Sequence, residues 1–303
     1  MQIINFGSIN FDRTYRVHRF PETGETLQTQ ELICGCGGKG LNQSIAISRA
    51  GGNVIHAGTI GNDGASLQRE MEENGVDCSR LMHVDSEQGH AVILVNDQGD
   101  NEILVHRGSN LMMTTEYIDG ILSSAQAPAM VLLQNEIPHA DHIIDQAHEK
   151  GFEVVFNASP VNEEMVSSVN FSHVCWLLIN EVEGEQLTAA SDPEDILDYF
   201  EKKYPEMNVV LTLGTDGSVG SFHGSRFQYG SYQVPVKDTT GAGDTYTGYF
   251  LAGIAGGKAP EESMKTATLA AAVSVTRSGA ASAIPMMEEV EACDREGSYD
   301  LRI

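Results

Sequence analysis

Two carboxylates and a glycine-rich bend lie together in the stretch Asp238-Thr239-Thr240-Gly241-Ala242-Gly243-Asp244-Thr245. The apolar residues from Tyr246 to Ile254 then recur at helical spacing, which predicts a helix whose first turn is Gly241-Ala242-Gly243. The unpaired N–H groups of such a turn form a binding site for an anion. Asp244 could simply stabilise the start of the helix, but beside an anion site it could also accept a proton from an attacking hydroxyl. This combination is typical of phosphoryl transfer.

A second glycine-rich stretch, Gly35-Cys36-Gly37-Gly38-Lys39-Gly40-Leu41-Asn42-Gln43, precedes another helical pattern. Its glycines match the G-x-G-x-x-G pattern of dinucleotide enzymes, and Asp63 follows about twenty residues later. The stretch does not follow the first predicted strand, however, which argues against a nicotinamide site. It is not a Walker loop either, because Lys39 is followed by glycine rather than by Ser or Thr. The pattern favours a backbone bend that brings Lys39 and Asn42 to a polar ligand such as a sugar.

The rest of the chain predicts the scaffold that these stretches need. Ile3 to Phe6 predicts a buried first strand, and Asn10 and Asp12 at its C-terminal end could shape a turn or bind adjacent hydroxyls. From about residue 110 onward, strands and helices alternate, which predicts a mainly parallel sheet with helices on both faces. Ligands bind at the carboxyl ends of such strands. Polar residues follow the predicted strands at that end: Asn135, Glu136, Asn157, Asn180, Glu183 and Gly214-Thr215-Asp216-Gly217.

Two segments interrupt this alternation. Residues 13–34 carry alternating strand patterns, and residues 89–107 predict a hairpin with a turn from Asn96 to Asp100. Together they predict a small separate sheet inserted in a single α/β unit of residues 1–303. Such a sheet could be a lid, a dimer surface or an ordinary extra hairpin.

The composition restricts the partners of the protein. Its 18 Lys and Arg residues against 43 Asp and Glu residues give a net charge of −25, which argues against binding to nucleic acid or to an anionic membrane. No secretory signal is expected, because Met1 leads directly into a strand pattern. Five scattered cysteines predict reduced thiols and a cytoplasmic protein.

Both glycine-rich stretches, in this order and about 200 residues apart, resemble the motifs of the ribokinase-like (PfkB) carbohydrate kinases. The resemblance covers the whole chain and implies a three-layer α/β sandwich with a central, mainly parallel sheet and a small β-sheet lid. It also implies that the γ-phosphoryl group of ATP is transferred to the primary 5-hydroxyl of D-ribose. Asp244 would be the base, and the helix start formed by Gly241, Ala242 and Gly243 would be the anion hole.

The resemblance also assigns binding residues. The positions that match sugar contacts are Asn10, Asp12, Gly38, Lys39, Asn42, Glu136 and Asp244. Those that match the ATP side are Asn180, Glu183, Thr212, Leu213, Gly214, Thr215, Asp216, Gly217, Gly243 and Thr268, with Glu183 acting indirectly on Mg²⁺. A monovalent cation, K⁺ in most of the family, would be held by Asp238, Thr240, Ser274, Arg277, Gly279 and Ala283. Ala283 departs from this pattern, because the family commonly has a Ser hydroxyl there, and here the serine is Ser282.

Several alternatives stay open. A related kinase could act on deoxyribose, a ketohexose or a nucleoside, since one scaffold serves all of these substrates. A sugar sensor without catalytic activity would be expected to lose the base, whereas Asp244 is present. A dinucleotide oxidoreductase is supported only by the early glycines. A homodimer through the small sheet is expected from the hairpin and from the resemblance.

Overall fold

The computed structural model describes residues 1–302, so Ile303, the last residue of the expected unit, lies outside the described residues. Its centre is an eight-stranded sheet that is buried on both faces. Neighbouring residues of one strand therefore belong to different cores: Ile3 packs on one side of the sheet and Ile4 on the other. Val209 and Val210 divide in the same way. Continuous apolar runs are what such a doubly covered strand requires.

Six neighbouring strands of this sheet are parallel, as the alternation of strands and helices predicted. In spatial order they are β4 (Asn53–Ala57), β1 (Gln2–Phe6), β9 (Ala129–Gln134), β10 (Glu153–Asn157), β11 (Trp176–Asn180) and β12 (Asn208–Thr212). Two antiparallel strands, β13 (Ser218–Phe222) and β14 (Ser225–Tyr229), complete it beyond β12. Two short pairs lie outside it, namely β5 (Thr59–Ile60) with β6 (Met82–His83) and β15 (Ser231–Gln233) with β16 (Asp300–Arg302).

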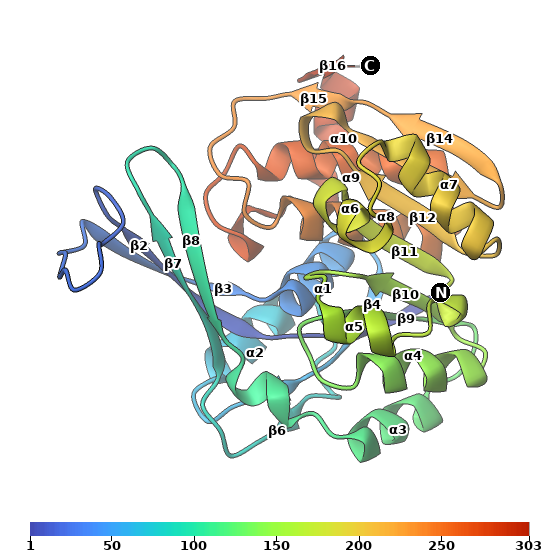
Figure 1. The fold of residues 1–303 in the computed structure, drawn as a ribbon, viewed down its shortest axis with the longest axis horizontal. Coiled ribbons are helices and arrows are strands. Elements are labelled where there is room, and N and C mark those ends of the chain that lie inside the picture. The colour runs from blue at the N-terminus through green and yellow to red at the C-terminus, as the bar shows by residue number, and fades with distance from the viewer. Residues whose placement is uncertain (303) are drawn as a thin grey trace.

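Helices cover both faces of the large sheet and make the fold a three-layer sandwich (Figure 1). One core contains residues of α1 (Lys39–Arg49), α2 (Ala65–Glu73), α8 (Ala242–Ala255), α9 (Pro260–Ser274) and α10 (Met287–Glu296). The opposite core contains residues of α3 (Thr115–Ser124), α4 (Ala140–Glu149), α5 (Glu163–Ser168), α6 (Glu181–Thr188) and α7 (Pro193–Lys203). No helix in the described part of the chain is long and apolar enough to cross a membrane.

A four-stranded sheet projects from one side of this body (Figure 1). Its order is β3 (Glu31–Gly37), β2 (Asn10–Arg16), β7 (Gly89–Val95) and β8 (Asn101–His106). The sheet differs from the expected segments, because β2 begins at Asn10 and residues 17–30 contain no strand. Asn10 and Asp12 are thus strand residues paired with Gly37 and Gly35, not part of a turn after β1. Pairing with the distant β3 overrides the local turn signal of these residues.

Close contact between α1 and α8 brings the two glycine-rich stretches together. A Cβ atom on Gly248 of α8 would overlap Ala46 of α1, so glycine at this position allows the helices to approach. The start of α1 also lies against the end of β1, where a Cβ on Gly40 would overlap Gly7. The first turns of both helices therefore lie at the carboxyl end of the parallel sheet.

Candidate active site

Asp244 lies in the first turn of α8 and is 8% exposed. The N-cap of this helix is Gly241, whose φ of 74° favours glycine. Asn42 Nδ2 donates to Asp244 Oδ2 at 2.9 Å, and Gln43 Nε2 donates to Asp244 Oδ1 at 2.9 Å. The carboxylate predicted to be a base is thus held by two amides from the other glycine-rich stretch, and each of its oxygens keeps a free lone pair.

The start of α8 offers free backbone donors at two of the three residues expected to form the anion hole. The Ala242 N–H already donates to the Thr239 carbonyl at 3.2 Å. Within the described residues, the N–H groups of Gly241 and Gly243 have no backbone acceptor. Gly243 is exposed, and a Cβ built on it would meet no protein atom within 4 Å. The space that a side chain of Gly243 would fill is therefore free of protein atoms, which favours the approach of an anion to this helix start.

Asp12 and Glu136 bring two further carboxylates close to Asp244. Burial, followed by the charges of Glu136 and Asp244, raises the pKa of Asp12 to about 6. Glu136 accepts hydrogen bonds from the Ser8 hydroxyl and from the Lys39 backbone N–H. Carboxylates crowded in this way are well suited to accept hydrogen bonds from the hydroxyls of a sugar.

Two amides and two glycines complete this side of the site. Asn10 is buried, and its Oδ1 accepts from Asn110 Nδ2 at 2.8 Å. Asn42 Oδ1 is buried and has no partner in the described residues, so it is available to a ligand hydroxyl. Gly38 has a φ of 90°, and a Cβ on the preceding Gly37 would overlap the Asp12 carboxylate. The sequence pattern indicated a role for Gly38 but none for Gly37, because the contact of Gly37 with Asp12 arises only from the pairing of β2 with β3.

Lys39 is the cation of this acidic cluster. Burial acts to lower the pKa of Lys39, but the charges of Asp244, Glu136 and Glu183 raise it above its ordinary value. The ammonium group therefore stays protonated at neutral pH. Lys39 lines a small cavity together with Asp244, Gly243, Glu183 and Asn180, and so lies between the expected sugar and nucleotide sides.

Asn180 and Glu183 have a structural role in addition to the expected one. They form a capping box at the start of α6: Glu183 N donates to Asn180 Oδ1, and Asn180 N donates to Glu183 Oε2, both at 2.9 Å. The same two residues line the cavity beside Lys39. The capping box fixes the Glu183 side chain, which is consistent with an indirect effect on a metal ion rather than direct ligation.

Of the other expected nucleotide residues, Thr212 ends β12 and lines the cavity. Leu213 and the turn Gly214–Asp216 follow it in the chain and are not among the lining residues, and Gly217 has a φ of 92°. Thr268 lies on α9, and its hydroxyl is buried without a partner in the described residues. Five other residues that line the cavity had no role expected from the sequence, namely Ser159, Leu178, Ile179, Tyr246 and Thr247.

Asp238 joins two of the segments that were expected to hold a monovalent cation. Its Oδ1 accepts from the Thr240 N–H at 3.0 Å and from the Thr240 hydroxyl at 2.7 Å, and its Oδ2 accepts from the Gly279 N–H at 2.8 Å. Burial opposes ionisation, but these hydrogen bonds keep the pKa of Asp238 below its ordinary value. Near Gly279 the available hydroxyl is that of Ser282, because a Cβ on this glycine would lie 2.5 Å from Ser282 Oγ.

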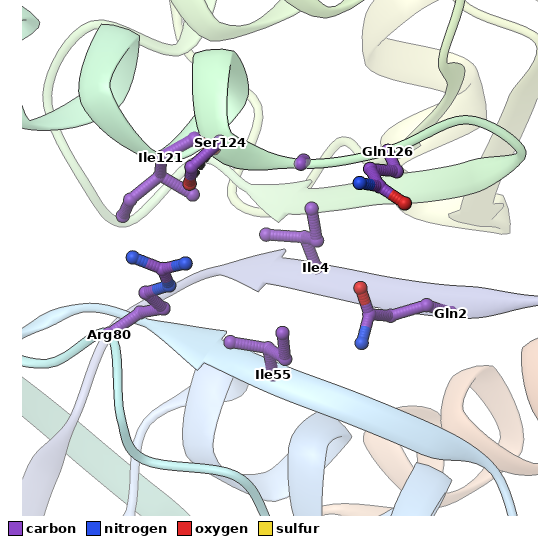
Figure 2. A pocket seen from close by; sticks show the side chains of 8 residues that line it. Gln2, Ile4, Ile55, Arg80, Ile121, Ser124 and Gln126 are labelled. Carbon is purple, nitrogen blue, oxygen red and sulfur yellow. Dashed lines mark hydrogen bonds between the residues drawn. The ribbon is translucent and has the colours of Figure 1, made fainter.

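A larger cavity of about 230 Å³ lies elsewhere, where α3 adjoins β1 and β4. Figure 2 shows the Ile4, Ile55 and Ile121 side chains inside it, with Arg80 and two glutamines around them. No carboxylate is among the described residues that line this cavity, so it offers no base for proton transfer. The cluster around Asp244 is therefore the better candidate for an active site.

Known proteins are similar to this chain over nearly its whole length. The model of the pfkB family of carbohydrate kinases matches residues 2–287. The ribokinase of Lactococcus lactis is 32% identical over 302 residues, covering 97% of each chain. The deoxyribokinase of Salmonella typhimurium is 29% identical and covers 95% of this chain and 97% of its own. The crystal structure of ribokinase from Cryptococcus neoformans in complex with ADP has a TM-score of 0.84 at 30% identity, covering 96% of this chain and 99% of the other. The chain belongs to the pfkB family of carbohydrate kinases.

Proposed function

We propose that this kinase transfers the γ-phosphoryl group of ATP to the 5-hydroxyl of D-ribose. The main support for the proposal is that Asp244 has a buried carboxylate and lies in the first turn of α8, at the exposed N-terminus of that helix. The similarity to ribokinases over the whole chain supports the choice of sugar. Asn10, Asp12, Asn42 and Glu136 supply acceptors for several hydroxyls of a small ring.

In the proposed reaction, Asp244 accepts the proton of the 5-hydroxyl as that oxygen bonds to the γ-phosphorus. The bond from phosphorus to the oxygen bridging the β- and γ-phosphates breaks, and ADP leaves with that electron pair. The N–H groups of Gly241 and Gly243 stabilise the charge on the transferring group. The Lys39 ammonium contributes a fixed positive charge at the same point.

The proposal includes two metal ions. The described residues contain no cluster of three or more His, Cys, Asp or Glu side chains suited to hold a metal. A Mg²⁺ ion would therefore take most of its ligands from the ATP phosphates and water, with Glu183 orienting the water, and it would neutralise phosphate charge. The segments around Asp238, Ser274 and Ala283 would hold K⁺ through backbone carbonyls, together with the Asp238 carboxylate, which is ionised at neutral pH.

The substrate is tested by measuring ADP release from Mg-ATP with ribose, deoxyribose, fructose, adenosine and pseudouridine, each in K⁺ and in Na⁺. Turnover that is highest on ribose and higher in K⁺ would support both the sugar and the cation site. Preference for deoxyribose or a nucleoside would retain the fold and the base but replace the sugar. Sugar binding without turnover on any of these compounds would contradict the kinase reaction and favour a sensor.

Replacing Gly243 by alanine should affect activity without lowering stability. The Gly243→Ala variant should be as stable as the parent or gain up to about 1 kcal/mol, because alanine favours the helix and its Cβ meets no protein atom. Its kcat should fall about tenfold or more, because the methyl group occupies the space proposed for the phosphoryl group. Thermal unfolding and steady-state kinetics measure the two effects, and an unchanged kcat would contradict the anion hole.

Ribose affinity should depend on pH through Asp12, whose pKa is about 6 in the unliganded protein. Below this pH the carboxyl is protonated and loses acceptor capacity, so ribose should bind about tenfold more weakly at pH 5 than at pH 7. Calorimetric titration with ribose alone measures this, since no base is needed for binding. The Asp12→Asn variant is the control: its affinity should be weaker but nearly constant over this range. The same dependence in the control would exclude Asp12.

Asp12 should also make the free energy of unfolding depend on pH, in the direction opposite to that for a salt-bridged carboxylate. The folded-state pKa of Asp12 lies above its ordinary value of 3.8, so the unliganded protein binds more protons than the unfolded chain. This group therefore lowers stability as pH rises from about 4 to about 6. Bound ribose should remove part of that loss.

We also propose that the small sheet is a lid over the sugar and a dimer surface. Its outer strands expose apolar side chains, including Leu104, which is 72% exposed, and Ile103 and Val105, each 54% exposed. An unpaired edge with such residues favours association. Light scattering at micromolar concentration tests this, and a monomer would contradict it.

Five free cysteines are consistent with the reducing cytoplasm that we propose as the location.

A further inference from the structure

A chain of buried polar side chains lies behind Asp244, and the proposed reaction does not use it. Its first member is Gln43, which is fully buried on α1. Gln43 Nε2 donates both to Asp244 Oδ1 at 2.9 Å and to Asn157 Oδ1 at 2.8 Å. Gln43 is thus in contact with the base, and Asn42 donates to the other carboxylate oxygen.

The orientation of Gln43 is fixed from behind. Gln134 Nε2 donates to Gln43 Oε1 at 2.8 Å and to Asn5 Oδ1 at 3.0 Å. Because Gln43 Oε1 is taken up as an acceptor there, its NH₂ group must face the carboxylate. Asn5 in turn uses its Nδ2 to donate to Ser44 Oγ and to the Gly40 carbonyl, both at 2.8 Å.

His56 determines the direction of the hydrogen bonds along this row of buried side chains. Its Nε2 lies 3.2 Å from the Gly7 carbonyl, which can only accept, so the proton is on Nε2. Burial lowers the pKa of His56 to about 4, so the ring is neutral at pH 7. Nδ1 must then accept the Ser44 hydroxyl, which is 2.8 Å away. Every amide from Asn5 to Gln43 therefore has one allowed orientation, which makes the network rigid, although Gln134 Oε1 is buried without a partner in the described residues.

We propose that Gln43 is the positioning residue of the base, fixing the plane of the Asp244 carboxylate so that a free lone pair faces the sugar hydroxyl. This inference rests on the proposed role of Asp244. It assigns different functions to the two neighbouring amides: Asn42 has an unpaired buried Oδ1 for the sugar, whereas Gln43 contacts only protein. Gln43 therefore acts on kcat, and Asn42 acts on both kcat and KM.

The test compares Gln43→Met with Asn5→Leu. Both variants remove one amide of the same buried chain, but only Gln43 touches Asp244. With Gln43→Met we expect kcat to fall about 10- to 100-fold while KM for ribose changes less than about twofold. With Asn5→Leu we expect a similar loss of thermal stability and a change in kcat of less than about threefold, because Gln43 keeps its own hydrogen bonds with Gln134 and Asp244. Equal losses of kcat in both variants, in proportion to stability, would overturn the inference.

A second variant keeps the test independent of folding. Gln43→Glu preserves shape and places a carboxylate beside Asp244, so the acid limb of the pH profile of kcat should move to higher pH by about one unit. An unmoved limb would contradict the inference. Failure of the proposed function is recognised separately: Asp244→Asn would then retain activity. If Asp244→Asn is inactive and Gln43→Met has the parent kcat, only the positioning role is wrong.

Discussion

The Asp244→Asn variant should bind ribose with an affinity within about threefold of the parent and lose about 10³-fold in kcat. An amide cannot accept the hydroxyl proton as the phosphoryl group is transferred, and a positioned base typically contributes 10²- to 10⁴-fold. The substitution should also cost about 1–3 kcal/mol of stability. Asn42 and Gln43 both donate to this side chain, and an asparagine leaves one of the two donors facing another NH₂ group.

A matched control separates the base from a helix-stabilising aspartate. Asp141 lies in the first turn of α4 as Asp244 lies in that of α8, but Asp141 is exposed. Asp141→Asn should lose a few tenths of a kcal/mol of stability and no activity. Steady-state kinetics, calorimetric ribose titration and thermal unfolding of both variants measure these effects. More than about a tenth of the parent kcat in Asp244→Asn would show that another group takes the proton.

The Lys39→Met variant should lower kcat/KM for ATP by about 10²- to 10³-fold, the range found when a group that stabilises transferring charge is removed. The structure gives two reasons. Lys39 lies between Asp244 and the residues of the nucleotide side, and it is the cation that offsets three carboxylates. Without it, Asp244, Glu136 and Glu183 would repel the incoming phosphates. The same repulsion should move the acid limb of the pH profile to higher pH.

The backbone contact from Lys39 N–H to Glu136 should survive this substitution, so the variant is expected to fold. Lys150→Met is the control, since that lysine is exposed at the end of α4. It should change neither activity nor stability measurably. Kinetics at several ATP concentrations, over pH 5.5 to 9, distinguish the two variants. A loss smaller than about tenfold in Lys39→Met would place the phosphoryl group away from this ammonium.

The sequence itself determined most of the scaffold. Apolar runs bounded by turns predicted the strands of the parallel sheet, and apolar residues at helical spacing after Gly243 predicted α8 with Asp244 in its first turn. These signals are local, because the periodicity of a segment reports how that segment meets a core whichever segments form it. The two glycine-rich motifs are also contiguous in the chain, which is why the family could be identified from them.

The tertiary structure decided which side chains meet. Gly37 lies against Asp12 only because β3 pairs with β2, and the same pairing excludes a turn at Asn10, which was one of the two roles that the sequence left open for it. Lys39 was expected among the sugar contacts, and the fold also brings it to Asn180 and Glu183 of the nucleotide side, which line the same cavity. Strand register and helix crossing depend on residues far apart in the sequence, and a period of two or 3.6 carries no information about them.

The buried amides behind Asp244 also show what the sequence determines and what only the tertiary structure decides. Ile3 to Phe6 was predicted as a buried strand and is one, but within it Asn5 serves as a hydrogen-bond partner of Ser44 and Gln134. A polar residue in an apolar run indicates only that some partner must exist, because an unpaired buried amide is costly. The partners themselves, 39 and 129 residues further along the chain, follow from the packing of β1, α1 and β9. The sequence thus determined the elements and the chemical groups of this kinase, and their contacts were decided by long-range packing.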